Sequence, residues 1–338
     1  MINRILIVGL GSIGKRHLRL VRQLLPAADI RVLRNTHATI VPEYASGYFY
    51  GMEEAIAFAP QIAIVANPAP FHIQAAHALA NIGAHLLIEK PLSSSLSGIS
   101  ELIKVCRGRN TILFTGYNLR FLSSLQAFKN LLVEGIVGNQ LSVRCEVGQY
   151  LPSWRPSIDY RQSVSARQDL GGGVLLELSH ELDYLRWIFG EVSWVRATLS
   201  KQSELEINVE DTAHLILGFD QKLDGKKLIG QVNLDFIRHD SVRKCTVIGD
   251  LGSLRWNGLN GQVAMYEAGT KGWKELLSHP HQSDDSYIEE LRCFTECVLA
   301  NKLPPITGED GLAVLKIIEA ARKSSQLDGK MIEVSKIS

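Results

Sequence analysis

The segment GGGVLLELSHELDYLRWIFG, residues 171–190, places a histidine and three carboxylates in an otherwise apolar stretch. Burying such groups costs free energy unless they are paired or used. His180 can change its charge near neutral pH and can therefore act as a general acid or base. On one continuous helix, Glu177 would share a face with His180 and could fix the tautomer of its ring. A core histidine that is satisfied by a neighbouring carboxylate is the competing interpretation of this segment alone.

A second candidate for proton chemistry is Lys90 in HLLIEKP. The lysine comes at the carboxyl end of a predicted parallel strand, where doubly wound folds bind their ligands. Its ammonium group can donate a charged hydrogen bond or move a proton, and the proline that follows restricts the turn. A plain strand-end charge is the alternative interpretation.

The N-terminal sequence VGLGSIGKRH contains Gly9, Gly11 and Gly14 in the pattern G-x-G-x-x-G. The pattern directly follows a predicted strand and opens a predicted helix, which is the context of a dinucleotide site. Glycines allow the backbone, including the N–H groups of Ser12 and Ile13, to approach a pyrophosphate at the helix N-terminus. The sequence therefore predicts a nicotinamide dinucleotide as cofactor.

The end of the next predicted strand, RVLRNTH, bears on which dinucleotide binds. An NAD site usually carries an acidic residue there, which holds the ribose 2′-hydroxyl. This stretch has no Asp or Glu and instead offers Arg34, followed by Asn35 and Thr36. Because a guanidinium can pair with a 2′-phosphate, the sequence favours NADP(H), with NAD(H) as the other possibility. A solvated strand-end arginine is the competing interpretation.

Other loops at the predicted strand ends add cofactor-lining candidates. These are Asn67, Pro68 and His72 after QIAIVAN, Glu89 beside Lys90, and Asn118 in GYNLRF.

The polar loop before the glycine triplet, residues 148–173, interleaves arginines with aromatic residues. Arg155, Tyr160 and Arg161 could hold an anionic sugar or its phosphate, so we predict that they contact the substrate. Surface charges, or a cover over the cofactor, are the alternatives for the same residues.

The order of the predicted elements indicates how these residues are positioned. Apolar strands alternate with helices over residues 1–120, which predicts a doubly wound parallel sheet, the α/β Rossmann class, that binds NAD(P). From residue 121 to 338, successive strands with partial alternation predict an α+β domain with an open, mainly antiparallel sheet.

The composition excludes several classes of partner. The 338 residues have a net charge of +1, with no basic run, so neither a nucleic acid nor a membrane surface is indicated as a partner. No signal peptide precedes the first strand and no apolar run is long enough to span a bilayer, which predicts a cytoplasmic protein. The five cysteines are scattered, as expected of reduced thiols. His279 and His281 lack further ligands at metal-site spacing, so no metal is expected.

Five segments together resemble the glucose–fructose oxidoreductase and inositol dehydrogenase (Gfo/Idh/MocA-like) family. They are GLGSIGKRH, NPAPFH, EKPLS, GYNLRF and GGGVLLELSHELD, and the resemblance extends over essentially the whole chain. It implies a Rossmann domain joined to an open-sheet domain that binds substrate and mediates oligomerisation. It also implies a homodimer or homotetramer formed through that second sheet.

The resemblance assigns roles residue by residue. It implies that Lys90 binds substrate and helps to move the hydroxyl proton, that His180 is its acid–base partner, and that Asp183 is the aspartate of an H-x-x-D ending. One departure concerns Glu177. The family pattern has an aspartate four residues before the histidine, whereas Glu177 lies three residues before His180.

The resemblance implies hydride transfer to or from a secondary alcohol or ketone of a sugar, a sugar acid or a nucleotide sugar. Two alternatives stay open. One is an NAD-linked cyclitol dehydrogenase of the inositol type. The other is a non-catalytic NAD(P)-sensing regulator on the same fold, although such a sensor has no need of both the lysine and the histidine.

Overall fold

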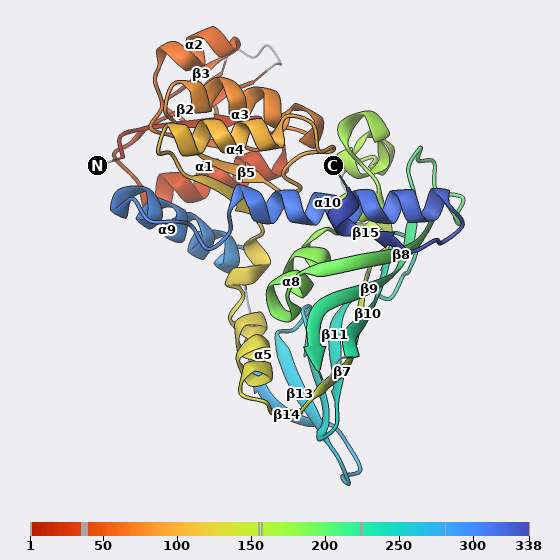
Figure 1. Ribbon diagram of the computed structural model, residues 1–338. Coiled ribbons are helices and arrows are strands. Elements are labelled where there is room, and N and C mark those ends of the chain that lie inside the picture. The colour runs from red at the N-terminus through yellow and green to blue at the C-terminus, as the bar shows by residue number, and fades with distance from the viewer. Residues whose placement is uncertain are drawn as a thin grey trace. The chain divides into compact units, whose positions relative to one another are not determined.

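A computed structural model (Figure 1) describes residues 2–34, 40–154, 156, 158–223, 226–280 and 282–337. The chain forms two compact units. Unit 1 comprises Met1–Asn118 and Ser286–Leu315, and unit 2 comprises Leu119–Asp285 and Lys316–Ser338.

Unit 1 contains a six-stranded parallel sheet of order β3-β2-β1-β4-β5-β6. This is the strand order of a dinucleotide-binding Rossmann fold, with its reversal between β1 and β4. The central strands are buried on both faces, which explains their continuous apolar sequences. The strands are β1 (Arg4–Val8), β2 (Asp29–Leu33), β3 (Gly47–Phe49), β4 (Ile62–Val65), β5 (His85–Glu89) and β6 (Leu113–Gly116).

Helices pack on the strands of unit 1, as the alternation of elements predicted. Those from the N-terminal part are α1 (Ser12–Leu24), α2 (Met52–Ala57), α3 (His72–Asn81) and α4 (Ile99–Gly108). Helix α9 (Asp285–Ala300) and the first part of α10 (Gly308–Gln326) also belong to this unit.

The place of α9 differs from the sequence prediction, which put all residues after 120 in the second domain. The reason is packing: Leu291 and Phe294 line the same small cavity as Ile5 and Ile62 of the parallel sheet. The ring of Phe294 also lies 5.7 Å from that of Phe114 on β6. An apolar helix stripe reveals that a helix is covered, but not which sheet covers it.

Unit 2 contains a nine-stranded sheet of order β14-β13-β12-β11-β7-β10-β9-β8-β15. Its pairs are antiparallel except β7 with β10, which confirms the predicted mainly antiparallel sheet. The strands are β7 (Gln140–Gly148), β8 (Val192–Ser200), β9 (Thr212–Leu223), β10 (Lys226–Asp235), β11 (Val242–Gly249), β12 (Gly252–Asn257), β13 (Gln262–Glu267), β14 (Lys274–Ser278) and β15 (Ile332–Glu333).

One face of this sheet carries the core of unit 2. Trp256 on β12 is buried there and donates a hydrogen bond to Ser124 Oγ at 3.0 Å, which ties the sheet to α5 (Ser123–Val133). Tyr184 packs against Trp256 with ring centroids 5.5 Å apart. On the opposite face, Ile216 of β9 and Ile229 of β10 are 43% and 46% exposed. Within the described residues, no helix is long and apolar enough to cross a membrane.

Candidate active site

The glycine loop of unit 1 is shaped by close backbone contacts. Gly9 has a φ of +89°, and a Cβ there would lie 2.8 Å from the backbone of Asn67. A Cβ on Gly14 would lie 2.2 Å from the carbonyl oxygen of Gly9, whereas one on Gly11 would meet open space. The loop therefore packs tightly inward at Gly9 and Gly14 and leaves room beside Gly11 at the start of α1, which includes Ser12 and Ile13.

The loop after β4 lies against the glycine loop. The side-chain oxygen Oδ1 of Asn67 is buried and, within the described residues, has no hydrogen-bond partner. Pro68 precedes the short 3₁₀ turn Ala69–Phe71 that leads into α3. His72 is buried, with its Nε2 2.6 Å from the carbonyl oxygen of Asn67 and its Nδ1 3.1 Å from that of Pro91. Burial lowers the pKa of His72.

The turn that follows β5 carries Glu89, Lys90 and Pro91. Glu89 is buried, while Lys90 is half-buried. The backbone N–H of Lys90 donates to Glu89 Oε2 at 3.1 Å, and Glu89 Oε1 lies 2.6 Å from Nε2 of His17 on α1. Burial acts to raise the pKa of Glu89, but the hydrogen bond and charge of His17 outweigh it and lower the pKa overall.

Arg34 directly follows β2 and is half-buried. Its backbone N–H donates to the carbonyl oxygen of Phe49 at 3.0 Å, which fixes the position of its main chain. Asn35 and Thr36, also predicted to line the cofactor site, lie outside the described residues. Asn118, at the other side of unit 1, is buried and donates from Nδ2 to Ser286 Oγ at 2.7 Å.

These observations fit a dinucleotide in unit 1. Gly11 occupies the N-cap position of α1 without a capping side chain, which leaves backbone N–H groups for a pyrophosphate. The buried and unsatisfied amide oxygen of Asn67 lies beside the same loop, and a buried acceptor of this kind calls for a donor.

In unit 2, the glycine triplet packs the start of α7 (Val174–Glu177) against neighbouring backbone. A Cβ on Gly172 would lie 2.4 Å from the carbonyl oxygen of Val164. Gly173 has a φ of +109°, and a Cβ there would lie 2.5 Å from Oε1 of Glu210. The same Oε1 accepts the backbone N–H of Leu175 at 3.1 Å, so Glu210 caps this short helix.

The structure corrects the prediction of one continuous helix over GGGVLLELSHELDYLRW, residues 171–187. Helix α7 ends at Glu177, and α8 (His180–Phe189) begins after a break at Leu178 and Ser179. The backbone N–H groups of Ser179 and Glu181 bond three residues back, which tightens the chain locally. Glu177 and His180 therefore lie on different helices, so a helical wheel does not give the relative orientation of their side chains.

Glu177 and His180 have different surroundings. Glu177 is half-buried and accepts a hydrogen bond from Ser165 Oγ at 3.0 Å. His180 is 8% exposed, at the first position of α8. Next to it, the hydroxyl of Ser179 is buried without a hydrogen-bond partner in the described part of the chain.

The two carboxylates of α8, Glu181 and Asp183, are buried and each forms an ion pair within unit 2. Arg120 binds Asp183 through two hydrogen bonds of 2.6 and 2.9 Å, and the two side chains are 6% and 1% exposed. Arg243 binds Glu181 at 2.9 Å. Sequence reasoning assigned Asp183 to the catalytic group, and the bidentate pair shows that it also holds Arg120 inside the fold. The pairing partner was missed because it lies 63 residues away.

The arginine-rich loop is tied together by its own acidic residues. Arg161 binds Asp159 at 2.9 Å and Glu206 at 3.4 Å while staying about half exposed. The hydroxyl of Tyr160 accepts the backbone N–H of Glu206 at 3.2 Å. Tyr160 also lines a small hollow with Trp154, next to Ser165. Arg155 lies outside the described residues.

Two family models match nearly the whole chain. The NAD-binding Rossmann fold of the oxidoreductase family matches residues 3–117, and the C-terminal alpha/beta domain of the same family matches residues 129–334. The chain thus has both halves of a two-domain oxidoreductase. It belongs to the Gfo/Idh/MocA oxidoreductase family.

Similar proteins include named dehydrogenases. Myo-inositol 2-dehydrogenase of Thermotoga maritima is 28% identical over 337 residues, which cover 95% of this chain and 96% of that protein. The scyllo-inositol 2-dehydrogenase (NADP(+)) IolW of Bacillus subtilis is 24% identical and covers 79% of this chain and 77% of its own. Levoglucosan dehydrogenase, solved in complex with NADH and levoglucosan, superposes with a TM-score of 0.83 at 19% identity and covers 99% of this chain and 100% of its own.

Proposed function

We propose that this oxidoreductase transfers a hydride between NADP(H) and a secondary alcohol or ketone of a carbohydrate-like substrate. Sugars, sugar acids, nucleotide sugars and cyclitols form the candidate class. The observation that carries the proposal is the edge of the unit 1 sheet. There, the glycine loop, the unsatisfied Asn67 oxygen and the Lys90 turn follow β1, β4 and β5 in turn. Neighbouring parallel strands bring these loops to the same edge, where this fold binds ligands.

The proposed chemistry requires a proton acceptor and a stabiliser of the developing alkoxide. Lys90 supplies a charged donor at the end of β5, and His180 supplies an imidazole at the start of α8. In the oxidation direction, Lys90 and His180 share the role of accepting the hydroxyl proton, and a bound nicotinamide would supply the acceptor for the hydride of the carbon that carries the hydroxyl. Glu177 and Asp183 are the proposed supporting carboxylates of His180 within unit 2. Glu177 accepts a hydrogen bond from Ser165, and Asp183 forms an ion pair with Arg120.

The cofactor preference rests on Arg34, which occupies the position after β2 where an NAD enzyme has an acidic residue. A relative named for NADP(+), IolW, supports this choice, while the NADH complex of levoglucosan dehydrogenase represents the alternative. Fluorescence titration with NADPH and NADH tests it. We expect tighter NADPH binding in the native protein and a loss of about 1.5–3 kcal/mol of NADPH affinity in Arg34→Ala. Tighter NADH binding that is unaffected by Arg34→Ala would contradict the proposal.

The substrate class is tested by turnover with the compounds for which relatives are named. The panel includes myo-inositol, scyllo-inositol, levoglucosan and 1,5-anhydro-D-fructose, together with nucleotide sugars. Lys90→Ala and His180→Ala are expected to abolish turnover at unchanged cofactor affinity. Turnover of cyclitols alone with NAD would favour the cyclitol dehydrogenase. Cofactor binding without turnover of any polyol, ketone or sugar would favour the NAD(P)-sensing regulator.

We also propose that the protein self-associates through the open face of the unit 2 sheet. Exposed Ile216 and Ile229 lie on the neighbouring strands β9 and β10, where Ile216 is opposite Gln231. Side chains two residues apart point to the same face, so the two isoleucines are neighbours there. A second copy of the chain would cover these two apolar side chains.

A further inference from the structure

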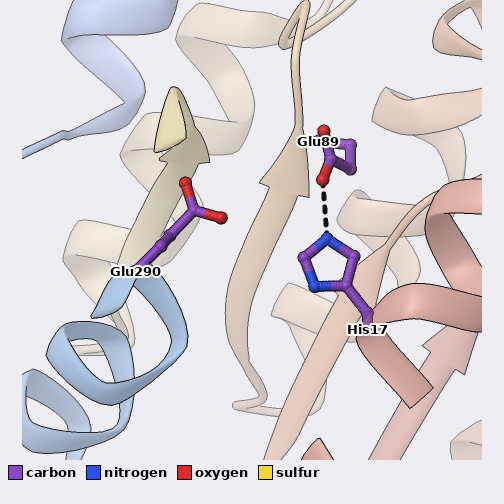
Figure 2. Close-up of side chains that lie close together, drawn as sticks. All are labelled: His17, Glu89 and Glu290. Carbon is purple, nitrogen blue, oxygen red and sulfur yellow. Dashed lines mark hydrogen bonds and ion pairs between the residues drawn. The ribbon is translucent and has the colours of Figure 1, made fainter. Parts of the chain in front are cut away.

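A buried cluster in unit 1 joins three side chains that the proposed reaction does not use directly. Figure 2 shows His17 from α1, Glu89 from the end of β5 and Glu290 from α9. A ring nitrogen of His17 and a carboxylate oxygen from each glutamate, the atoms that could bind a metal, lie within 4.8 Å of one another. His17 and Glu290 are fully buried, and Glu89 is 6% exposed. The sequence did not predict that these three side chains lie together, because they are far apart in the chain.

Glu89 connects two structural elements by using both carboxylate oxygens. Oε1 lies 2.6 Å from Nε2 of His17, and Oε2 accepts the backbone N–H of Lys90 at 3.1 Å. The carboxylate thereby links α1 to the main chain of Lys90. His17 is three residues beyond Gly14, in the first turns of the helix whose N-terminus is proposed to bind the pyrophosphate.

Glu290 adds a second carboxylate to the cluster. Its carboxylate and that of Glu89 both approach the His17 ring, because one ligand-type atom from each of the three side chains lies within 4.8 Å of the others. The neighbouring Tyr287 packs edge-on against the His17 ring at 6.0 Å, with the Arg16 guanidinium 4.7 Å from the Tyr287 ring centroid. These contacts hold the His17 ring in a defined orientation.

The Lys90 turn is held from its other side as well. His72 places one ring nitrogen 3.1 Å from the carbonyl oxygen of Pro91 and the other 2.6 Å from that of Asn67. The residues on both sides of Lys90 are therefore fixed by buried histidines, while the Lys90 side chain itself is half-buried.

We propose that His17 is a positioning residue that couples cofactor binding at the start of α1 to the main chain of Lys90 through Glu89. A dinucleotide that orders the N-terminus of α1 also orders His17, and His17 then holds the Glu89 carboxylate that fixes Lys90. The coupling rests on the proposed function for the cofactor site and for Lys90. Glu290 supports it by bringing a second buried carboxylate to the His17 ring from α9.

Amide hydrogen exchange measured by mass spectrometry tests this coupling. Overlapping peptides that begin well before Glu89 and end before or after Lys90 resolve the Lys90 amide, and Pro91 adds no signal because it has no N–H. His17→Phe keeps an aromatic ring and removes the hydrogen bond to Glu89, whereas His17→Gln restores a donor. In the apo protein, we expect the Lys90 amide to exchange about tenfold faster in His17→Phe. The reason is that the Glu89 carboxylate, which accepts the Lys90 N–H, loses its hydrogen bond of about 1–1.5 kcal/mol to His17. His17→Gln is expected to recover most of the protection.

Added NADPH gives the second readout. In the native protein, we expect NADPH to slow exchange in both the glycine loop, residues 9–14, and the Lys90 amide. In His17→Phe, it should protect the glycine loop only. Glu290→Gln should weaken the transmitted protection, and its exposed neighbour variant Glu289→Gln is the matched control that should not.

The outcomes separate this inference from the proposed function. If NADPH protects the glycine loop but the Lys90 amide behaves alike in native protein and His17→Phe, the coupling is refuted while the cofactor site stands. If NADPH leaves the native glycine loop unprotected, the proposed cofactor site fails. If the Lys90 amide of apo His17→Phe exchanges at the native rate, the positioning role of His17 is refuted. A tightly bound metal that is lost in Glu290→Gln would also overturn this interpretation of the cluster.

Discussion

The ion pair between Arg120 and Asp183 provides a direct test of whether the Asp183 carboxylate is structural. Both side chains are nearly inaccessible and are joined by two charge-assisted hydrogen bonds. In Asp183→Asn, the Arg120 guanidinium stays buried without its counter-charge. Breaking one side of a buried pair costs about 3–5 kcal/mol, so we expect the free energy of unfolding of unit 2 to fall by that amount.

Urea unfolding followed by tryptophan fluorescence measures this loss selectively. All five tryptophans lie between residues 119 and 285, so the signal reports on unit 2 alone. Asp169→Asn is the matched control, because Asp169 pairs with Arg167 at the exposed surface and should leave the unfolding midpoint unchanged. The double variant Arg120→Met with Asp183→Leu should recover part of the stability, since neither charge is then left unpaired.

A loss below about 1 kcal/mol in Asp183→Asn would refute this reasoning, because it would mean that the pair is solvated. Asp183→Asn with native stability but without turnover would then return Asp183 to a purely catalytic role. NADPH affinity provides a further control, since the glycine loop belongs to unit 1 and should bind the cofactor normally.

Three further predictions address other parts of the chain. Ile216→Lys should shift the protein toward monomers in analytical ultracentrifugation, and an unchanged sedimentation coefficient would argue against the open sheet face as the interface. The pKa of Glu89 is lowered in the fold, so its contribution to stability is present above the unfolded pKa of about 4.3 and is lost as the pH falls through the folded value. Glu89→Gln should therefore show a weaker loss of stability on acidification below about pH 4.3, measured by circular dichroism. Burial raises the thiol pKa of Cys145, Cys245 and Cys293 alike, so accessibility decides their order of reaction. Half-buried Cys293 should react with a thiol reagent before the fully buried Cys145 and Cys245, and equal labelling rates for all three would contradict the packing.

Several features were predictable from the sequence because they depend on local pattern. The parallel and antiparallel sheets follow from runs and alternation of apolar residues. The glycine loop follows from its spacing between a strand and a helix. In both cases, the residues that determine the feature are close together in the chain.

Features that depend on distant partners could not be predicted in the same way. The pair of His17 with Glu89 spans 72 residues, and a single histidine on a helix does not indicate its partner. The break between α7 and α8 was missed because spacings of three and four residues both fit a continuous helix. The histidine of GLGSIGKRH lies about one helical turn past Gly14, on the side of α1 that faces the sheet, and its burial there was the available signal for His17.

The membership of α9 in unit 1 has a consequence for how the protein is made. The parallel sheet lacks the Leu291 and Phe294 side chains of that helix until residues 119–285 of unit 2 have been synthesised. At about 5–20 residues per second, a ribosome takes on the order of ten seconds or more to cross the intervening segment. During that interval, a nascent nucleotide-binding unit presents an uncovered apolar surface. Until α9 has been synthesised, a chaperone, or early folding of residues 119–285, must keep the unfinished sheet from aggregating.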